Sequence, residues 1–253
     1  MDYACKIKYF LERIMALYVI ADLHLSTENA AKSMEVFGNR WQDYQNKIKR
    51  NWNKLVTESD TVIVPGDVSW ALSLEDAIPD LKFLDTLNGK KLLMKGNHDF
   101  WWTSLTKMRN LFEAEGISSI DFLYNNAVEV EGYILTGSRG WFVDPSIQTK
   151  NVNADFEKIN NRELIRLKIG LDAAKELQGE NDTEIIAFFH FPLMWGDFKN
   201  EKMIDMLREY GITRSYFGHI HGNYFTSGNF EHNGLKMRLI SADFLDFVPL
   251  FVQ

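Results

Sequence analysis

The sequence predicts an α/β fold, and three observations support that prediction. Short apolar runs rich in β-branched residues recur along the chain and are typical of buried strands. Segments in which apolar residues recur at helical spacing lie between these runs. Each apolar run also stops abruptly at Gly, Asp, Asn or His. Alternating strands and helices are the pattern of an α/β domain.

The predicted strands share a polar carboxyl end. They span residues 16–21, 61–65, 92–95, 134–136, 185–189 and 215–217. In open α/β sheets, ligands collect outside the carboxyl ends of the strands. We therefore expect the polar side chains that follow these runs to meet at one site.

The predicted helices occupy the segments between these strands. They span residues 42–56, 74–87, 104–114, 153–178 and 199–210. The longest, 153–178, spaces Leu164, Leu167, Leu171 and Ala174 along one face. We expect this helix to cover the sheet or to overhang the site.

The pattern changes after His221. Two short apolar runs, 224–226 and 235–240, flank the turn-forming sequence His232-Asn233-Gly234. This arrangement is typical of a β-hairpin. We therefore expect the fold to finish in antiparallel strands.

The chain of 253 residues is expected to form one domain over residues 15–253, because it contains no internal repeat, low-complexity tract or Pro/Gly-rich linker. Residues 1–14 are predicted to be an N-terminal extension. Two interpretations fit them. The first strand could begin the native protein at Met15, or residues 1–14 could form a short helix that packs Phe10, Leu11 and Ile14 on the domain.

The composition indicates a soluble globular protein, with 45% hydrophobic and 25% charged residues. No apolar run approaches the 18 residues of a membrane span, so we expect no membrane partner. The N-terminus lacks the continuous apolar centre of a secretory signal, which predicts a cytoplasmic location. The 28 basic and 35 acidic residues give a net charge of −7, which disfavours non-specific binding to nucleic acid. Composition leaves the oligomeric state open.

Five of the six histidines follow an apolar run and lie beside Asp, Asn or Gly: His24, His98, His190, His219 and His221. The single cysteine, Cys5, forms neither an internal disulfide nor a cysteine-based metal cage. Imidazole combined with carboxylate and amide oxygens suits Mn, Fe, Zn or Co. Asp22, Asp67 and Asn97 also follow apolar runs, and with four of these histidines they make seven candidate ligands. One catalytic zinc is held by three protein ligands, so the sequence predicts two divalent ions. Paired ions are typical of in-line displacement at phosphorus, which indicates phosphoester hydrolysis.

Five motif blocks in this order resemble the calcineurin-like metallophosphoesterases. They are Asp22-x-His24, Gly66-Asp67, Gly96-Asn97-His98-Asp99, His190 and Gly218-His219-x-His221. A lone Asp-x-His or Gly-Asp carries little information and Gly-Asn-His-Asp is moderately specific, but the ordered set is highly specific. The resemblance covers about four fifths of the chain. It implies two stacked mixed β-sheets flanked by helices, in a four-layer α/β/β/α sandwich.

The resemblance also implies a role for each matching residue. Asp22, His24 and His221 would hold the first metal ion, and Asp67 would bridge to the second. Asn97, His190 and His219 would complete the second site. A hydroxide that bridges the ions would attack phosphorus, and His98 would stabilise the phosphate or protonate the leaving oxygen. Asp99 would stabilise its loop without binding metal.

The substrate is narrowed by a departure from the serine/threonine protein phosphatases of this superfamily. Those enzymes carry an Arg shortly after the Gly-Asp motif, whereas Gly66-Asp67 continues here as Val68-Ser69-Trp70-Ala71. The sequence is more similar to the bacterial and archaeal phosphohydrolases that include the class III cyclic-nucleotide phosphodiesterases. A small phosphoester is therefore the expected substrate.

Two further features fall near the motifs. Arg139 follows the strand predicted at 134–136, so it could offer a guanidinium to the substrate phosphate or pair with an acidic residue on the surface. Five tryptophans also lie within a few residues of the strand ends: Trp70, Trp101, Trp102, Trp141 and Trp195. They could line a pocket or close the fold.

Several functions fit these observations. The favoured one is a phosphodiesterase on a small or nucleotide-like substrate, and the alternative is a phosphomonoesterase on a small metabolite. A metal-bound interaction module without turnover is a third hypothesis. A DNA nuclease is the weakest, because the charge is −7 and no extended basic tract is present.

Overall fold

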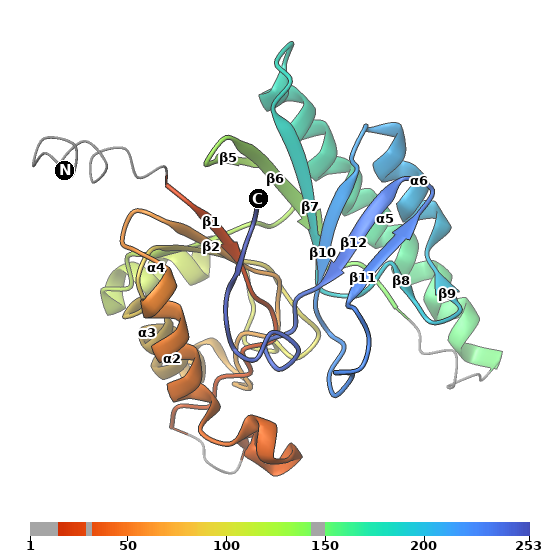
Figure 1. The fold of residues 1–253 in the computed structure, drawn as a ribbon. Coiled ribbons are helices and arrows are strands. Elements are labelled where there is room, and N and C mark those ends of the chain that lie inside the picture. The colour runs from red at the N-terminus through yellow and green to blue at the C-terminus, as the bar shows by residue number, and fades with distance from the viewer. Residues whose placement is uncertain (1–14, 29–31, 143–149) are drawn as a thin grey trace, which may run out of the picture.

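The computed structural model describes residues 15–28, 32–142 and 150–253. In the long helix that begins at residue 150, it describes the side chains from residue 156 onward. Two mixed sheets stack face to face, and helices cover both outer faces (Figure 1). The predicted α/β fold is confirmed. The predicted extension at residues 1–14 lies outside the described residues.

The first sheet has the strand order β13-β1-β2-β3-β4. The four strands β1 to β4 run parallel, and β13 pairs antiparallel with β1 at one edge. The strands are β1 (Leu17–Val19), β2 (Thr61–Val64), β3 (Lys90–Leu93), β4 (Ile120–Phe122) and β13 (Leu250–Phe251). The parallel pairing places the carboxyl ends of β1, β2 and β3 together.

The second sheet has the order β11-β12-β10-β7-β6-β5. Its four central strands are parallel, and each edge strand is antiparallel to its neighbour. The strands are β5 (Val128–Val130), β6 (Tyr133–Ser138), β7 (Glu184–Phe189), β10 (Arg214–Phe217), β11 (Asn229–His232) and β12 (Leu235–Leu239). A separate two-stranded ribbon joins β8 (Met194–Trp195) to β9 (Phe198–Lys199).

The helices divide between the two sheets (Figure 1). The first sheet carries η2 (Met34–Phe37), η3 (Asn39–Trp41), α2 (Tyr44–Leu55), α3 (Leu74–Asp85) and α4 (Leu105–Glu115), and the second carries α5 (Lys150–Gln178) and α6 (Glu201–Glu209). Serine side chains at residues 73 and 104 accept backbone N–H bonds at the starts of α3 and α4. These caps explain why both helices begin close to the positions that the sequence predicts.

Three apolar clusters fill the three interfaces between the four layers. The first packs the helices before residue 116 on the first sheet, with Trp52 and Trp101 fully buried. The second packs α5 and α6 on the second sheet, through Leu167, Leu171 and Met203. The third lies between the sheets and contains side chains from both. Strands buried on both faces explain the continuous apolar runs in the sequence.

The C-terminal hairpin differs from the prediction in one strand. The turn lies at Asn233-Gly234, which both have positive φ, as a two-residue hairpin turn requires. The first strand begins at Asn229, however, and residues 224–226 form a turn instead. The reason is a tertiary contact, because the Tyr224 hydroxyl donates a hydrogen bond to the Asp243 carboxylate at 2.9 Å.

No helix among the described residues is long and apolar enough to cross a membrane. The longest, α5, is amphipathic. It buries Leu167 and Leu171 against the second sheet and exposes Ile165 and Ile169.

One strand of the first sheet, β3, carries a buried lysine. The Lys91 side chain is fully enclosed, and its Nζ donates hydrogen bonds to the carbonyl oxygens of Leu87 at 2.6 Å and Gly89 at 2.8 Å. These carbonyls follow the C-terminal end of α3, where a positive charge is favourable. Burial nevertheless lowers the pKa of Lys91 from 10.5 to about 8.

We expect Lys91→Met to change how stability depends on pH. Between pH 8 and 10.5 the folded wild type binds fewer protons at Lys91 than the unfolded chain, so its stability rises with pH relative to the variant. The expected relative gain is on the order of 1 to 3 kcal/mol. Urea unfolding of both proteins at pH 7.5, 9 and 10.5 measures it. Parallel stability curves for the two proteins would contradict the burial cost.

Candidate metal centre

The polar strand ends meet at one edge of the molecule. Asp22 and His24 follow β1, Asp67 follows β2, and Asn97 follows β3 of the first sheet. From the second sheet, His190 follows β7, and His219 and His221 follow β10. Hydrogen bonds join these loops to one another, as between the His219 backbone N–H and the Asp22 carboxylate at 2.9 Å.

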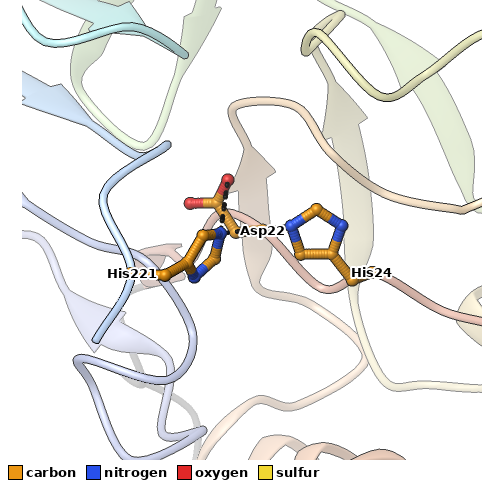
Figure 2. A group of neighbouring side chains, drawn as sticks. All are labelled: Asp22, His24 and His221. Atoms are coloured by element: carbon orange, nitrogen blue, oxygen red, sulfur yellow. Dashed lines mark hydrogen bonds and ion pairs between the residues drawn. The ribbon is translucent and has the colours of Figure 1, made fainter. Parts of the chain in front are cut away.

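One group of side chains consists of Asp22, His24 and His221 (Figure 2). The Nε2 atoms of His24 and His221 are 3.2 Å apart, and His221 Nε2 is 3.8 Å from Asp22 Oδ1. One ion with metal–nitrogen bonds of about 2.0 to 2.1 Å can contact both imidazoles at that separation. The three potential ligand atoms all lie within 4.8 Å of one another.

A second group surrounds the Asn97 amide. Its Oδ1 is 2.6 Å from His190 Nε2 and 3.0 Å from His219 Nδ1. Asp67 Oδ2 is 3.5 Å from the same His190 nitrogen. Asp22, Asp67 and His190 also offer ligand atoms within 4.8 Å of one another.

Asp67 lies between the two groups. Its Oδ2 atom is 3.7 Å from His24 Nε2 in the first group and 3.5 Å from His190 Nε2 in the second. Its Oδ1 atom accepts a hydrogen bond from the His98 backbone N–H at 2.8 Å. That bond fixes the carboxylate so that Oδ2 points between the imidazoles.

The donor set fits divalent cations. Asp22 is fully buried, and neither its Oδ1 nor His24 Nδ1 has a hydrogen-bond partner among the described residues. Buried polar atoms without a partner are rare and costly. Carboxylate oxygen, amide oxygen and imidazole nitrogen together suit borderline divalent metals.

The protein environment shifts the pKa values of these groups. Burial raises the pKa of Asp22 to about 8 and that of Asp67 to about 6. Burial lowers the pKa of His190 to about 3 and that of His219 to about 2, and it places that of His24 well below its ordinary value. These three imidazoles are therefore neutral at physiological pH, which is the form that binds a metal.

His221 is the exception among the imidazoles. Burial acts to lower its pKa, but the hydrogen bond that its Nδ1–H donates to Asp243 and the charge of Asp22 outweigh that effect and raise the pKa to about 9. His221 is therefore protonated on both ring nitrogens at neutral pH, and a metal ion bound to its Nε2 would displace the proton there.

Four of the seven predicted ligands have a left-handed backbone: Asp22 (φ +61°), His24 (φ +45°), Asp67 (φ +52°) and His219 (φ +70°). Such φ values are uncommon for residues other than Gly and persist only where the surroundings impose them. Backbone hydrogen bonds between the β1 and β2 loops impose them on Asp22, His24 and Asp67. Asp22 N–H donates to Gly66 O at 3.0 Å, and His24 N–H donates to Asp67 O at 2.9 Å.

The motif glycines allow these loops to touch. A Cβ atom at Gly96 would lie 2.0 Å from Asp67 Oδ1 and 2.3 Å from its backbone nitrogen. A Cβ atom at Gly218 would lie 2.4 Å from Asp22 Oδ2. No side chain fits at either position while the neighbouring aspartate keeps its place.

Asp99 joins the loops that follow β2 and β3. Its buried carboxylate accepts backbone N–H bonds from Asp67 at 2.8 Å, from Val68 at 2.9 Å and from Gly96 at 2.8 Å. The Trp101 indole N–H donates a further bond at 2.9 Å. Burial raises the pKa of Asp99 to about 7, and the charge of Asp67 acts in the same direction. The sequence predicts that Asp99 stabilises its loop, and these bonds supply the physical basis for that expectation.

His98 lies half-buried at the mouth of the centre and belongs to neither ligand group. Its ring centroid is 4.3 Å from that of Trp70, which itself stacks on His24 at 4.8 Å. Trp41 also contacts the first group, 5.6 Å from the His221 ring. These aromatic rings form one wall of the centre.

The other tryptophans pack elsewhere. Trp101 and Trp102 are buried in the helical layer of the first sheet, and Trp195 packs on Phe230. Trp141 packs edge-on against Phe191, close to Arg139. Trp70 therefore lies beside the candidate metal centre, whereas Trp101 and Trp102 pack in the core of the fold.

Arg139 lies outside both ligand groups. It lines a separate cavity of about 170 Å³ that Lys95 and Glu163 also line. Its Nη2 atom is 3.7 Å from the Glu163 carboxylate.

Sequence reasoning missed Asp243. This buried carboxylate is 2.8 Å from His221 Nδ1 and also accepts bonds from the Gly222 N–H and the Tyr224 hydroxyl. A carboxylate behind an imidazole fixes the tautomer and orientation of the ring. Asp243 follows β12 in no recognisable motif, so only the fold reveals its position.

Comparison with known proteins identifies the family of the chain. A family model described as calcineurin-like phosphoesterase matches residues 15–223. An uncharacterized protein of Methanocaldococcus jannaschii is 26% identical over 152 residues, which are 57% of this chain and 83% of that protein.

Solved structures of low identity share the fold. TT1561 of Thermus thermophilus superposes with a TM-score of 0.55 at 10% identity, over 95% of this chain and 99% of that one. Phosphopantetheinyl hydrolase of Mycobacterium tuberculosis gives a TM-score of 0.52 at 15% identity, over 94% and 95% of the two chains.

We expect Asp99→Asn to destabilise the protein by about 2 to 4 kcal/mol at pH 8, because an amide replaces an anion that accepts several buried N–H bonds. Urea unfolding measures the change. Asp172→Asn is the matched control, since Asp172 is exposed and pairs with Lys168 on the surface. Equal losses of stability in the two variants would contradict the role of Asp99.

We expect Asp243→Asn to weaken binding of one metal ion by about 10 to 100-fold, because His221 loses the carboxylate that orients it. Calorimetric titration of the metal-free protein with Mn²⁺ measures the affinity, and Asp172→Asn again serves as the control. Unchanged affinity for both ions would show that the His221 orientation does not depend on Asp243.

Proposed function

The chain belongs to the calcineurin-like phosphoesterase family and is a metal-dependent phosphoesterase; we propose that it is a phosphodiesterase that cleaves a small or nucleotide-like diester with two divalent ions. The observation that carries this proposal is the pair of ligand groups on either side of Asp67. Two groups that share one carboxylate are the arrangement that paired catalytic ions require.

In this proposal, Asp22, His24 and His221 hold the first ion, and Asn97, His190 and His219 hold the second. Asp67 bridges them. The distances among these side chains support the assignment, since each group converges within bonding reach of one ion. When bound, two such ions lower the pKa of an attacking water and neutralise charge on the phosphoryl oxygens.

The chain itself supplies positioning and proton transfer. His98 is fixed by its backbone N–H bond to Asp67, and no hydrogen bond to another described residue holds either ring nitrogen. Its imidazole is therefore able to donate a proton to the leaving oxygen. The Trp70 ring beside it restricts the directions that the imidazole can take.

The aromatic wall favours a diester over a monoester. Trp70 borders the first ligand group and is partly exposed, whereas Trp41 is buried behind it, and the Phe100 side chain beside His98 is 59% exposed. Aromatic faces suit an esterified, uncharged substituent or a nucleobase better than the extra negative charge of a monoester. A phosphomonoesterase is the alternative, and an interaction module without turnover is the non-enzymatic one.

Hydrolysis of bis-p-nitrophenyl phosphate and p-nitrophenyl phosphate with added Mn²⁺ tests the proposal. We expect the diester to be the better substrate of the wild type. We expect Asp67→Asn to lose at least about 100-fold in kcat/KM, because both ions lose a ligand. This loss exceeds the one expected when a residue that only orients a ligand is replaced. Asp172→Asn is expected to retain wild-type rates.

Each other outcome selects an alternative. A preference for the monoester would select the phosphomonoesterase. Bound metal without hydrolysis of either ester would select the interaction module. Full activity in a folded Asp67→Asn variant would contradict the bridging role.

A further inference from the structure

A cavity lies at the same sheet edge as the metal centre. We call it the Arg139 pocket; its volume is about 170 Å³, and residues after β3, residues after β6 and one face of α5 form it. The side chains that matter are Lys95, Ser138, Arg139, Arg162, Glu163 and Arg166. Nothing in the proposed reaction uses this pocket.

The pocket concentrates positive charge in an acidic protein. It is lined by four cationic side chains and one carboxylate, whereas the whole chain carries a net charge of −7. The fully buried Glu163 accepts a bond from Arg166 at 2.6 Å and lies 3.7 Å from Arg139. Among the described residues, no carboxylate pairs with Lys95 or Arg162. The pocket therefore has an excess of positive charge that an anion would neutralise.

The guanidinium of Arg139 lines the pocket, packed near two aromatic rings, and one of its N–H groups is free to donate a hydrogen bond. Arg139 lies 5.4 Å from the Trp141 ring and 5.9 Å from the Phe191 ring. Its buried Nε has no hydrogen-bond partner among the described residues. An oriented arginine fork matches the oxygens of a phosphate in a bidentate manner.

The pocket shares β3 with the metal centre, because Asn97 follows that strand, and in the second sheet it borders β6, the neighbour of β7. Asp67 follows β2 and His190 follows β7, while the pocket borders β3, which neighbours β2, and β6, which neighbours β7. The Phe191 backbone N–H, next to His190, donates to Arg139 O at 2.9 Å. Lys95 of the pocket is two residues from Asn97 in the sequence, and neighbouring strands are about 4.8 Å apart, so the pocket and the metal centre are adjacent.

We propose that the Arg139 pocket binds a second phosphate group of the substrate, so that the enzyme prefers phosphoesters that carry a phosphate besides the one cleaved. This inference rests on the proposed function and specifies its substrate class. Arg139 contacts the second phosphate directly. Glu163 is a positioning residue that holds the arginines at the wall of the pocket.

The charge count favours phosphate over carboxylate. After Glu163 neutralises one cation, three positive charges remain, and a terminal phosphate brings nearly two negative charges. A carboxylate would leave more of that charge uncompensated. The aromatic wall and the Arg139 pocket then bind different parts of one molecule, the former an aromatic group and the latter a phosphate.

Calorimetric binding of two matched nucleotides to the Mn²⁺-loaded protein tests the pocket. Thymidine 5′-phosphate carries one phosphate and thymidine 3′,5′-bisphosphate carries two. We expect the wild type to bind the bisphosphate at least tenfold more tightly. We expect the preference to fall below twofold in Arg139→Gln and Arg166→Gln. Arg139→Lys, which keeps the charge but loses the fork, is expected to retain part of it.

Arg208→Gln is the matched control, because Arg208 is an exposed arginine on α6 that does not line the pocket. It is expected to keep the full preference. Equal affinity of the wild type for the two nucleotides would overturn the proposal. So would an undiminished preference in Arg166→Gln. The Arg166 side chain is partly exposed, so misfolding is a poor explanation for a loss of the preference in that variant.

A kinetic comparison separates failure of the pocket from failure of the proposed function. The 5′-p-nitrophenyl esters of thymidine 5′-phosphate, with and without a 3′-phosphate, serve as substrates. If the pocket acts as proposed, the 3′-phosphate raises kcat/KM at least tenfold in the wild type and not in Arg139→Gln. Hydrolysis of both esters at one rate would overturn the pocket alone. Hydrolysis of neither would contradict the phosphodiesterase, while calorimetry would still test the pocket.

Discussion

The close approach of backbones at the strand ends is the constraint on which the rest of this structure depends. Gly96 lies against Asp67, and Gly218 lies against Asp22, at distances that leave no room for a Cβ atom. These contacts bring candidate ligands from both sheets to one point. The cost is paid in left-handed backbone at Asp22, His24 and Asp67, which the hydrogen bonds between loops offset.

Electrostatics follows from this geometry. The crowded centre buries carboxylates and imidazoles together, so burial raises the pKa values of the former and lowers those of most of the latter. A centre of this kind gains from a divalent cation. The adjacent Arg139 pocket has the opposite requirement, because its cations exceed its one carboxylate. The two sites therefore call for opposite charges along a single sheet edge.

The sequence predicts the helices and the central strands well because each buries a regular apolar pattern. The predicted helix at 74–87 and the observed α3 (Leu74–Asp85), for instance, differ only at the C-terminal end. The strands it misses are short and peripheral, such as β4, β5 and β13. Two or three residues carry too little periodicity to reveal a strand, and the pairing of β13 with β1 depends on chain segments more than 200 residues apart.

The sequence by itself determined the α/β class and the candidate ligands, because strand patterns are local and the ordered motifs lie at the ends of those strands. The tertiary structure alone decided how these residues combine: that Asp67 lies between two ligand groups, that Asp243 supports His221, and that Glu163 draws arginines into a pocket. The physical reason is that these contacts join residues from separate strands and helices. Their distances are set by the packing of two sheets, which no local pattern encodes.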